Sequence, residues 1–412
     1  MPENAKKPQI RFKGFTDAWE QRKLGEIANK VLDKNIGLQY VETLTNSAEY
    51  GIISQREFFD HNISKIESLE GYYIVQNNDF VYNPRISTTA PVGPINRNKL
   101  GRSGVMSPLY TVFRVENVDF TFLEYFFKTN CWHAFMNYNG DSGARSDRFS
   151  IKDNIFFEMP IVIPRIEEQI KIGKYMLKLD NLITLHQRKL DKLKNIKKSM
   201  LEKMFPKNGS NVPEIRFTGF TDAWEQRKFG ESVLIERGGS PRPIDEYITD
   251  DSRGLNWIKI GDAPEQGNYI TKTAEKIKTT GLSKTRQVVP GDLILSNSMS
   301  FGRPYIMAIE GCIHDGWLLI RNIRDEFDLI FLCYLLGIPQ MIKQYKSMAA
   351  GSTVNNLNKE LVGNTIVKIP PKDEQIHLGK FFNNLDNLIT LHQRKLEKLQ
   401  NIKKACLEKM FV

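Results

Sequence analysis

Apolar residues recur in the same order along two long stretches of the chain. Across 172–204 they follow steps that alternate between four and three residues, and 378–410 repeats the pattern. Such steps align side chains along one stripe of an α-helix, as in the seam of a coiled coil. A stripe of this length needs burial, so we expect the two helices to pack against each other. The seam positions are Ile172, Met176, Leu179, Ile183, His186, Leu190, Leu193, Lys197, Met200 and Met204, then Leu378, Phe382, Leu385, Ile389, His392, Leu396, Leu399, Lys403, Cys406 and Met410.

Each of these helices has a predictable start. A proline-containing break precedes it, at Pro164 or at Pro370-Pro371. Acidic residues fill each first turn, Glu167-Glu168 or Asp373-Glu374, and suit the positive end of the helix dipole. After Phe205-Pro206 the segment KNGSNV is typical of a linker. We therefore predict long helices over 165–205 and 371–412, with a linker at 206–212.

The remaining segments, 1–164 and 213–370, have the pattern of mixed α/β modules. Short apolar runs lie between Gly, Asn and Pro breaks, as strands do. We expect strands over 72–75, 79–82, 110–113 and 292–295, and aromatic-rich helices over 122–138 and 329–345. Each module returns to an apolar run just before its long helix, at 159–164 and at 365–370.

The chain also contains an internal repeat. PQIRFKGFTDAWEQRKL at 8–24 recurs as PEIRFTGFTDAWEQRKF at 213–229, and NLITLHQRKL at 181–190 recurs at 387–396. Matching ends with divergent middles predict a shared frame that carries two different specificities. The expected fold is α+β, with two modules joined by two long helices in a pseudo-twofold repeat. Trp19 and Trp224 are interpreted as anchors of each module, while Arg22, Lys23, Arg227 and Lys228 could face a partner or phosphate.

Charge is concentrated in the repeated helices. The formal net charge is +10, and 181–206 and 387–412 contribute +5 and +4 of it. Lysine-rich helices often only have solvated faces, but a basic helix also attracts polyanions, and both interpretations remain open.

Composition narrows the class of protein further. The four cysteines form no CxxC pair, no stretch approaches about 20 uninterrupted apolar residues, and the first residues form no apolar signal region. We expect a protein of the reducing cytoplasm with no membrane span and no metal site. His186 and His392 have no nearby Cys or Asp to complete a metal set and are interpreted as packed interface histidines.

Catalytic motifs are scarce in this sequence. It has no GxxxxGK[ST], HExxH or GxSxG motif. Asn83-Pro84-Arg85-Ile86 partly matches the Asn-Pro-Pro-aromatic tetrad of adenine methyltransferases, but the second proline and the aromatic ring are missing. No glycine-rich cofactor loop precedes it. We predict no catalytic residue in this chain.

Polar loops in corresponding places of the two modules are better candidates for a site. Loops at 84–90 and 140–148 in the first module match loops at 296–303 and 351–356 in the second, and 237–243 is peculiar to the second. Arg can contact guanine, Asn can pair with adenine, and Ser or Thr can serve bases or phosphates, although such loops are also ordinary turns. The candidate DNA-binding residues are Asn83, Arg85, Ser87, Thr88, Arg97, Arg102, Arg145, Arg148, Arg242, Asn297, Ser298, Ser300, Arg303, Ser352, Thr353 and Asn355 in the modules, with Lys194, Lys197 and Lys403 on the helices.

The duplicated RFxGFxDAWEQRK segment, the divergent module and the EEQ- or DEQ-initiated helix ending in LEKMF together resemble the DNA-specificity subunit of type I restriction–modification enzymes. The resemblance covers essentially the whole chain. It implies two target-recognition domains, 1–164 and 213–370, each reading one half of a bipartite, asymmetric site in double-stranded DNA. The two helices would run antiparallel as a coiled coil, hold the domains apart and dock two modification subunits.

The resemblance also implies where cofactors bind. The modification subunits would bind S-adenosylmethionine and methylate adenine, and two restriction subunits would add ATP- and Mg²⁺-dependent translocation and cleavage. This chain would hold no cofactor. Two alternatives remain: a protein-interaction adaptor that binds no DNA, and a self-contained DNA methyltransferase that binds S-adenosylmethionine itself.

Overall fold

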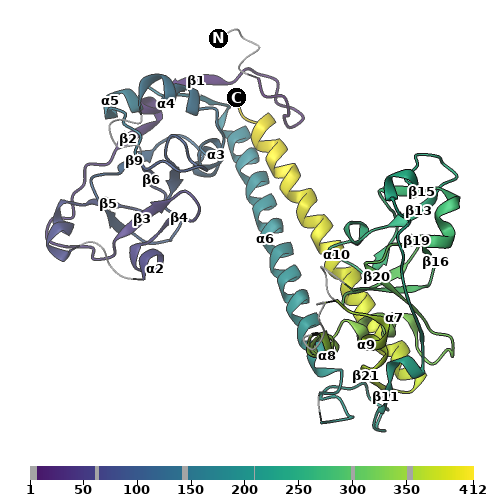
Figure 1. The fold of residues 1–412 in the computed structure, drawn as a ribbon. Helices are drawn as coiled ribbons and strands as arrows, with labels where there is room; N and C mark the ends of the chain where they lie inside the picture. Colours follow the sequence, from purple (N-terminus) through teal and green to yellow (C-terminus); the bar gives the residue numbers. More distant parts are fainter. Residues whose placement is uncertain (1–6, 61–64, 142–146, 208, 298–301, 350–355) are drawn as a thin grey trace. The chain divides into compact units, whose positions relative to one another are not determined.

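The computed structural model describes residues 7–60, 65–141, 147–207, 209–297, 302–349 and 356–412. The chain divides into two compact units (Figure 1). Unit 1 comprises Met1–Leu185 and Leu396–Val412, and unit 2 comprises His186–Lys395. Each unit thus contains one module together with parts of both long helices, α6 (Ile166–Lys203) and α10 (Lys372–Lys409).

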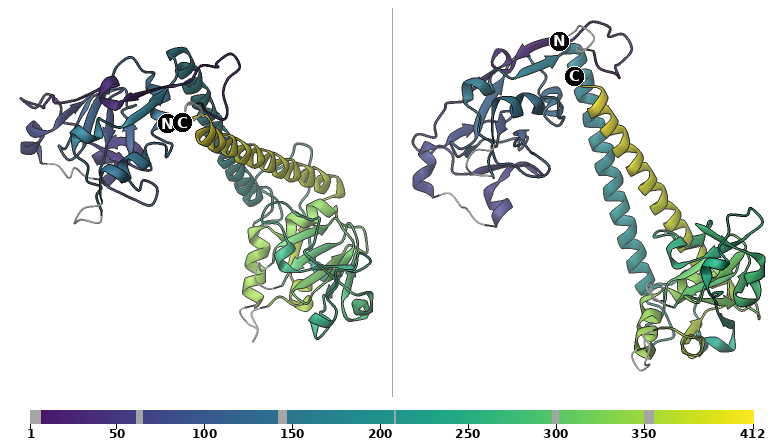
Figure 2. Two further views of the ribbon diagram at one scale, coloured as in Figure 1. Left: turned by 90° about the horizontal axis from the view of Figure 1, so that it is seen from above. Right: turned by 45° about the horizontal axis from the view of Figure 1, so that its top comes forward.

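The two long helices run antiparallel within each unit. In unit 2, His186 meets His392 and Lys197 meets Asp386, so residue numbers rise along α6 as they fall along α10. In unit 1, Asp180 meets Lys403. The helix segments of each unit lie side by side in Figure 1 and in both views of Figure 2. Most predicted seam residues are buried or half-buried, which confirms the heptad pattern.

Unit 1 has a four-stranded sheet in the order β2-β9-β6-β7 and three two-stranded pairs, β1-β10, β3-β4 and β5-β8. Its strands are β1 (Glu20–Lys23), β2 (Ala28–Lys30), β3 (Leu44–Ser47), β4 (Gly51–Ser54), β5 (Tyr73–Val75), β6 (Phe80–Tyr82), β7 (Ile95–Arg97), β8 (Gly104–Met106), β9 (Thr111–Val115) and β10 (Pro160–Ile163). Its shorter helices are α1 (Leu24–Ile27), α2 (Gln55–Phe59), α3 (Phe120–Phe126), α4 (His133–Asn139) and α5 (Asp153–Phe156).

Unit 2 has a five-stranded sheet, β12-β20-β17-β18-β14, a four-stranded sheet, β15-β13-β19-β16, and the pair β11-β21. Its strands are β11 (Glu225–Lys228), β12 (Leu234–Arg237), β13 (Leu255–Ile258), β14 (Tyr269–Ile270), β15 (Glu275–Ile277), β16 (Arg286–Val288), β17 (Leu293–Ser296), β18 (Pro304–Met307), β19 (Gly311–Ile313), β20 (Trp317–Arg321) and β21 (Ile366–Ile369). Its shorter helices are α7 (Leu329–Leu336), α8 (Pro339–Ala349) and α9 (Lys359–Gly363).

The four strands predicted from the sequence are present as β5, β6, β9 and β17. The two aromatic-rich helices differ from the prediction because each is broken in two. In unit 1 the break follows α3, where the Thr129 hydroxyl donates to the Phe126 carbonyl. In unit 2 it falls at Gly337, and Pro339 opens α8, where a missing N–H is tolerated.

The repeated EQRK segment is part of the frame in both units. It forms β1 or β11 and pairs antiparallel with the apolar run before the long helix, so that Glu20 faces Ile163 and Glu225 faces Ile369. The preceding tryptophans are almost completely buried, at 2% exposed for Trp19 and 1% for Trp224. Both lie in cores that include residues of the long helices, which confirms their role as anchors.

The helix starts are held by buried ion pairs that the sequence analysis did not foresee. The Arg11 guanidinium donates to both carboxylate oxygens of Glu168 at 2.7 Å, and the Arg216 guanidinium donates to both carboxylate oxygens of Glu374 at the same distances. Both glutamates are 1% exposed. The helix dipole is therefore an incomplete explanation for these acids, because each also locks the repeated IRF segment onto its helix.

Candidate nucleic-acid interface

In the first module, the two predicted polar loops meet. The Phe149 amide donates to the Pro84 carbonyl at 2.7 Å, and the Ile86 amide donates to the Asp147 carbonyl at 3.1 Å. These bonds bring Arg85 and Arg148 opposite each other in an antiparallel bridge. Arg85 is exposed and Arg148 half-buried, and neither side chain has an ion-pair partner among the described residues. Two uncompensated guanidinium groups therefore share one surface.

The polar residues around this pair have distinct positions. The Asn83 side chain donates to the Asn46 carbonyl at 2.7 Å and accepts from the Arg85 amide at 3.0 Å. It therefore connects the start of the loop to the segment that contains Asn46. Reciprocal backbone bonds between Ser87 and Ala90, both 3.1 Å, close a tight turn. The turn leaves Ser87 and Thr88 exposed.

Two other predicted arginines of this module are engaged within the protein. Arg97 donates to Glu124 at 2.7 and 3.0 Å, and both side chains are largely buried. Arg102 donates to the two oxygens of Glu42 at 2.8 and 2.7 Å. Burial alone would raise the pKa of Glu124, but Lys128, Lys99 and Arg97 together lower it to about 2. The contacts of Arg97 and Arg102 are those of residues that stabilise the module.

The second module repeats the meeting of the loops. The Leu357 amide donates to the Asn297 carbonyl at 3.1 Å, in the place where Phe149 bonds to Pro84 in the first module. Asn297 is 2% exposed, and its amide donates to the Asp315 carbonyl at 2.8 Å. The Asn297 side chain thus bonds to the backbone of another segment, as the Asn83 side chain does. The candidates Arg145, Ser298, Ser300, Ser352, Thr353 and Asn355 lie outside the described residues.

Asp315 joins the third loop, 237–243, to this surface. The Ser240 hydroxyl donates to its carboxylate at 2.8 Å, and the Arg242 guanidinium lies 3.7 Å from it. Burial opposes ionisation of Asp315, but the Ser240 bond and His314 leave its pKa lowered. Asp315 could not be identified from the sequence, because a single acidic residue in HDGW matches no binding motif and its partner Ser240 is 75 positions away.

A cleft of about 550 Å³ lies in unit 2 between the module and the helices. Arg303 lines it, donating to the Glu265 carbonyl at 2.7 Å with its guanidinium 5.0 Å from the centre of the Tyr305 ring. Lys194 and Lys198 of α6 line the opposite side. Both lysines are exposed and have no ion-pair partner in the described part of the chain. The cleft is also lined by Glu265 and by the paired Lys197 and Asp386, so its net charge is positive but not free of carboxylates.

Unit 1 has a corresponding cleft of about 700 Å³, lined by Thr89 and Asn96 of the module and by Lys403 and Lys404 of α10. Lys403 and Lys404 occupy the repeat positions of Lys197 and Lys198. Lys404 is exposed and unpaired among described residues, whereas Lys403 contacts Asp180 at 2.5 Å. Lys197 contacts Asp386 at the same distance. The predicted lysines Lys197 and Lys403 are thus neutralised within the helix pair.

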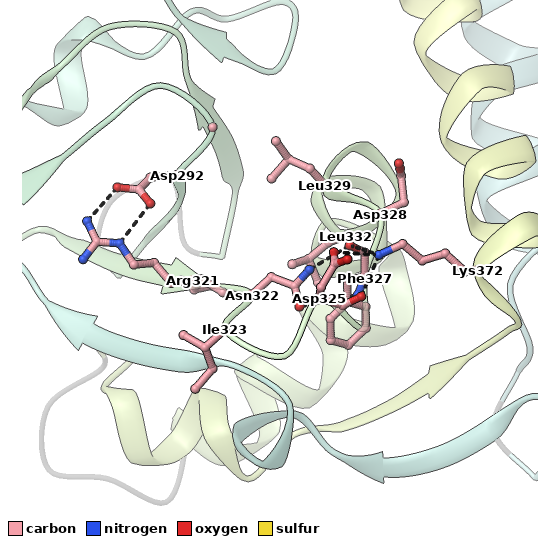
Figure 3. A pocket seen from close by; sticks show the side chains of 12 residues that line it. Asp292, Arg321, Asn322, Ile323, Asp325, Phe327, Asp328, Leu329, Leu332 and Lys372 are labelled. Carbon is pink, nitrogen blue, oxygen red and sulfur yellow. Dashed lines mark hydrogen bonds and ion pairs between the residues drawn. The ribbon is translucent and has the colours of Figure 1, made fainter.

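A further hollow of about 570 Å³ in unit 2 lies beside β17 and β20 (Figure 3). Its cations are already paired. Arg321 donates to the two oxygens of Asp292 at 3.0 and 2.9 Å, and Lys372 donates to Asp325 and to the Phe327 carbonyl. This hollow is a weaker candidate for binding a polyanion than the two clefts.

The described residues bear on the degenerate tetrad, on metal binding and on membrane insertion. In Asn83-Pro84-Arg85-Ile86 the last side chain packs against the core of the module, where the tetrad of adenine methyltransferases has an aromatic ring. No group of three or more His, Cys, Asp or Glu in the described ranges could hold a metal ion. No helix within those ranges is long and apolar enough to span a membrane.

Comparison with known proteins identifies the family. The model of the type I restriction modification DNA specificity domain matches the chain twice, over residues 16–195 and 221–401. The chain belongs to this family. The two matches coincide with the two repeats, so each module with its helix forms one specificity domain. The chain is a DNA-specificity subunit of the type I restriction–modification class, as the sequence resemblance predicted.

Individual relatives agree with this assignment. The type I restriction enzyme MjaVIII specificity subunit of Methanocaldococcus jannaschii is 23% identical over 400 residues, which cover 94% of this chain and 90% of that protein. The putative type I restriction enzyme MjaX specificity subunit of the same organism is 24% identical over 259 residues, covering 62% and 59%.

Solved structures share the fold. The type I restriction–modification S subunit from M. genitalium covers 98% of this chain and 99% of its own, with a TM-score of 0.53 and 14% identity. The HsdS subunit from Thermoanaerobacter tengcongensis covers 95% and 96%, with a TM-score of 0.50 and 18% identity.

As a member of this family, the chain is the sequence-specific DNA-recognition subunit and not a catalytic one. The adaptor alternative finds no support in the comparisons.

Proposed function

We propose that each module of this subunit reads one half of a bipartite, asymmetric DNA target. The observation that carries the proposal is the repeated loop junction, Phe149 to Pro84 in one module and Leu357 to Asn297 in the other. A corresponding backbone bond joins loops of different sequence in the two modules, as expected of two readers with different targets. Arg85 and Arg148 are the strongest base-reading candidates in the first module, because their backbones pair in one antiparallel bridge and neither side chain has an ion-pair partner among the described residues.

The lysines of the clefts suit phosphate rather than bases. Lys194, Lys198 and Lys404 lie on the helices and are exposed, and lysine is a compact charge without the planar fork of arginine. We assign them to the DNA backbone flanking each half-site. Lys197 and Lys403 are left out of this assignment because Asp386 and Asp180 already neutralise them.

The wider assembly follows from the same proposal. The helices would set the distance between the half-sites and dock two modification subunits that carry S-adenosylmethionine. Two restriction subunits would bring ATP- and Mg²⁺-dependent translocation and cleavage, and the complex would act in the cytoplasm. Support comes from the family and from the absence of a cofactor motif in the sequence. Pure chain mixed with labelled S-adenosylmethionine and DNA should transfer no methyl group.

The experiment that tests the proposal maps methylated adenines after the chain is combined with its modification subunits. We expect one asymmetric sequence with two specified halves and an unspecified spacer of fixed length. Arg85→Ala should relax one half only, while Arg165→Ala, an exposed arginine at the start of α6, should leave both halves unchanged. A map with one contiguous specified block, or with no sequence preference, would overturn the proposal.

A further inference from the structure

The same three-residue network occurs in both units. In unit 1 the Tyr125 hydroxyl donates to Asp180 at 2.6 Å, and Lys403 contacts the other oxygen of Asp180 at 2.5 Å. In unit 2 the Tyr334 hydroxyl donates to Asp386 at 2.5 Å, and Lys197 contacts the other oxygen of Asp386 at 2.5 Å. Each network joins a module helix, α3 or α7, to both long helices.

Each tyrosine is held firmly in its role as a donor. Tyr125 is 2% exposed and Tyr334 is 5% exposed. Burial and the neighbouring aspartate both raise the pKa of each phenol, so the hydroxyl keeps its proton. A buried hydroxyl that loses its acceptor is costly, and an ionised acceptor makes the bond stronger than a neutral one.

Three contacts between the module and α6 follow one another along this helix, and the tyrosine network is the one farthest from the start of α6. At the near end, Gln169 accepts from the Asp119 amide at 3.0 Å, just before α3. One turn along, Gly173 lets the helices approach closely, since a Cβ there would lie 2.8 Å from the Asp119 carboxylate. Asp180 follows on the same face, eleven residues or about 16 Å beyond Gln169.

Unit 2 repeats this line of contacts. Gln375 accepts from the Asp328 amide at 2.8 Å, and a Cβ on Gly379 would lie 2.8 Å from the Asp328 carboxylate. Asp386 occupies the far position, bound to Tyr334. The two modules differ in sheet order and strand number, yet both dock on their helices through the same three contacts.

Two separated contacts fix a tilt that one contact cannot. The shared core already packs α3 or α7 on the long helices, but apolar packing is not directional. Without the far contact we therefore expect the tilt of α3 or α7 to vary, so that the loops of the module move along the DNA. We infer that Tyr125 and Tyr334 are positioning residues, which hold each module at one tilt on its helix and so restrict the complex to one spacer length. This inference rests on the proposed function, because it concerns the orientation in which each module meets its half-site.

The decisive substitutions are Tyr125→Phe and Tyr334→Phe in the full chain. Each removes one hydroxyl and leaves the ring, the Asp–Lys pair and the reading loops in place. Tyr138→Phe is the matched control, because Tyr138 is 90% exposed and lies in the first module. The readout is methylation, by the chain with its modification subunits, of DNA targets that carry the wild-type half-sites at spacers one base pair shorter, equal and one longer.

We expect the wild type and Tyr138→Phe to prefer one spacer strongly. Tyr125→Phe and Tyr334→Phe should each reduce the preference for that spacer over its neighbours by about tenfold, and the half-site sequences should not change. Asp180→Asn keeps a carbonyl acceptor for Tyr125 and should lose less of the preference than Asp180→Ala.

A purely structural role predicts a different result. In that case Tyr→Phe would lower the melting temperature and reduce methylation at all spacers evenly, with the preference unchanged. That result would overturn the inference while leaving the proposed function intact. If the wild type itself methylated no bipartite sequence, the proposed function would fail instead.

Discussion

The Nδ1 atoms of His186 and His392 lie 2.8 Å apart across the two long helices. These residues are equivalent in the internal repeat, 206 positions apart. When equivalent residues of two antiparallel helices meet, the local two-fold axis of the helix pair passes between them. A hydrogen bond between two ring nitrogens needs one donor and one acceptor, so at least one of the two imidazoles must be neutral.

The histidine contact predicts a loss of stability in mild acid. Burial, followed by the charge of His186 and of nearby lysines, lowers the pKa of His392. A lowered histidine pKa means that the unfolded chain binds the proton more readily. The contribution of this contact is therefore present above the ordinary pKa near 6.5 and is lost as the pH falls below it. Melting temperatures of the full chain between pH 8 and pH 5 test this.

The comparison requires two variants. His392→Asn should show a smaller fall in melting temperature between these pH values than the wild type. His377→Asn removes an exposed histidine from the same helix and should behave as the wild type does. Equal pH dependence in the wild type and His392→Asn would show that the pair does not titrate with folding.

A half-chain of residues 1–206 should form a symmetric dimer. Unit 1 is completed by Leu396–Val412, so the isolated half leaves its seam exposed. The second copy carries the equivalent helix, and His186 of one copy would then meet His186 of the other. With its modification subunits, this dimer should methylate a palindrome built from the first half-site alone. A monomer in sedimentation experiments, or an asymmetric site, would contradict the pairing.

The loop arginines and the helix lysines should differ in effect. Arg148→Ala should weaken discrimination at the first half-site by about 1–3 kcal/mol if its guanidinium contacts a base edge. Lys194→Ala should weaken binding evenly across sequences and flatten its salt dependence, because phosphate contacts release counterions. Binding titrations on matched and mismatched duplexes at several salt concentrations separate the two. A change of base preference in Lys194→Ala alone would refute the division.

Glu124 should contribute stability that acid removes. Its pKa of about 2 in the folded module lies below the ordinary 4.5. A lowered carboxyl pKa stabilises the fold fully above about pH 4.5, by about 3 kcal/mol, and the contribution is lost as the pH falls toward 2. Urea denaturation should show Glu124→Gln well below the wild type at pH 7, with the gap in unfolding free energy shrinking to less than half of that value by pH 3. The exposed Glu67→Gln is the control, and a gap independent of pH would be inconsistent with this account.

Periodic features could be predicted from the sequence. The heptad seam predicted the long helices and their packing against each other, the family resemblance supplied their antiparallel direction, and the apolar runs located β6 and β17 before the loops that follow them. Lys197 shows the limit. Its place on the seam was visible, but its partner Asp386 lies 189 positions away, and a lysine pattern alone suggested phosphate.

The same limit applies within the modules. Arg97 looked like the other loop arginines until the fold brought Glu124 from α3 against it. Charge that is compensated through tertiary contacts is invisible in sequence, whereas Arg85 keeps the exposure that its loop suggested.

The central claim is that the helices set the distance between two half-sites. Each helix has 38 residues and is about 57 Å long. His186 of α6 faces His392 of α10. Seven residues inserted after His186 and seven inserted after His392 would therefore lie opposite each other in the helix pair. The seam stays in register if the fourth and seventh inserted residues are apolar.

The insertion would lengthen the helix pair by about 10 Å, or about three base pairs at ~3.4 Å each. The most direct measurement is the methylation map of this doubly extended variant beside that of the wild type. The account predicts two unchanged half-sites separated by a spacer about three base pairs longer. An unchanged spacer in a folded, active complex would contradict it.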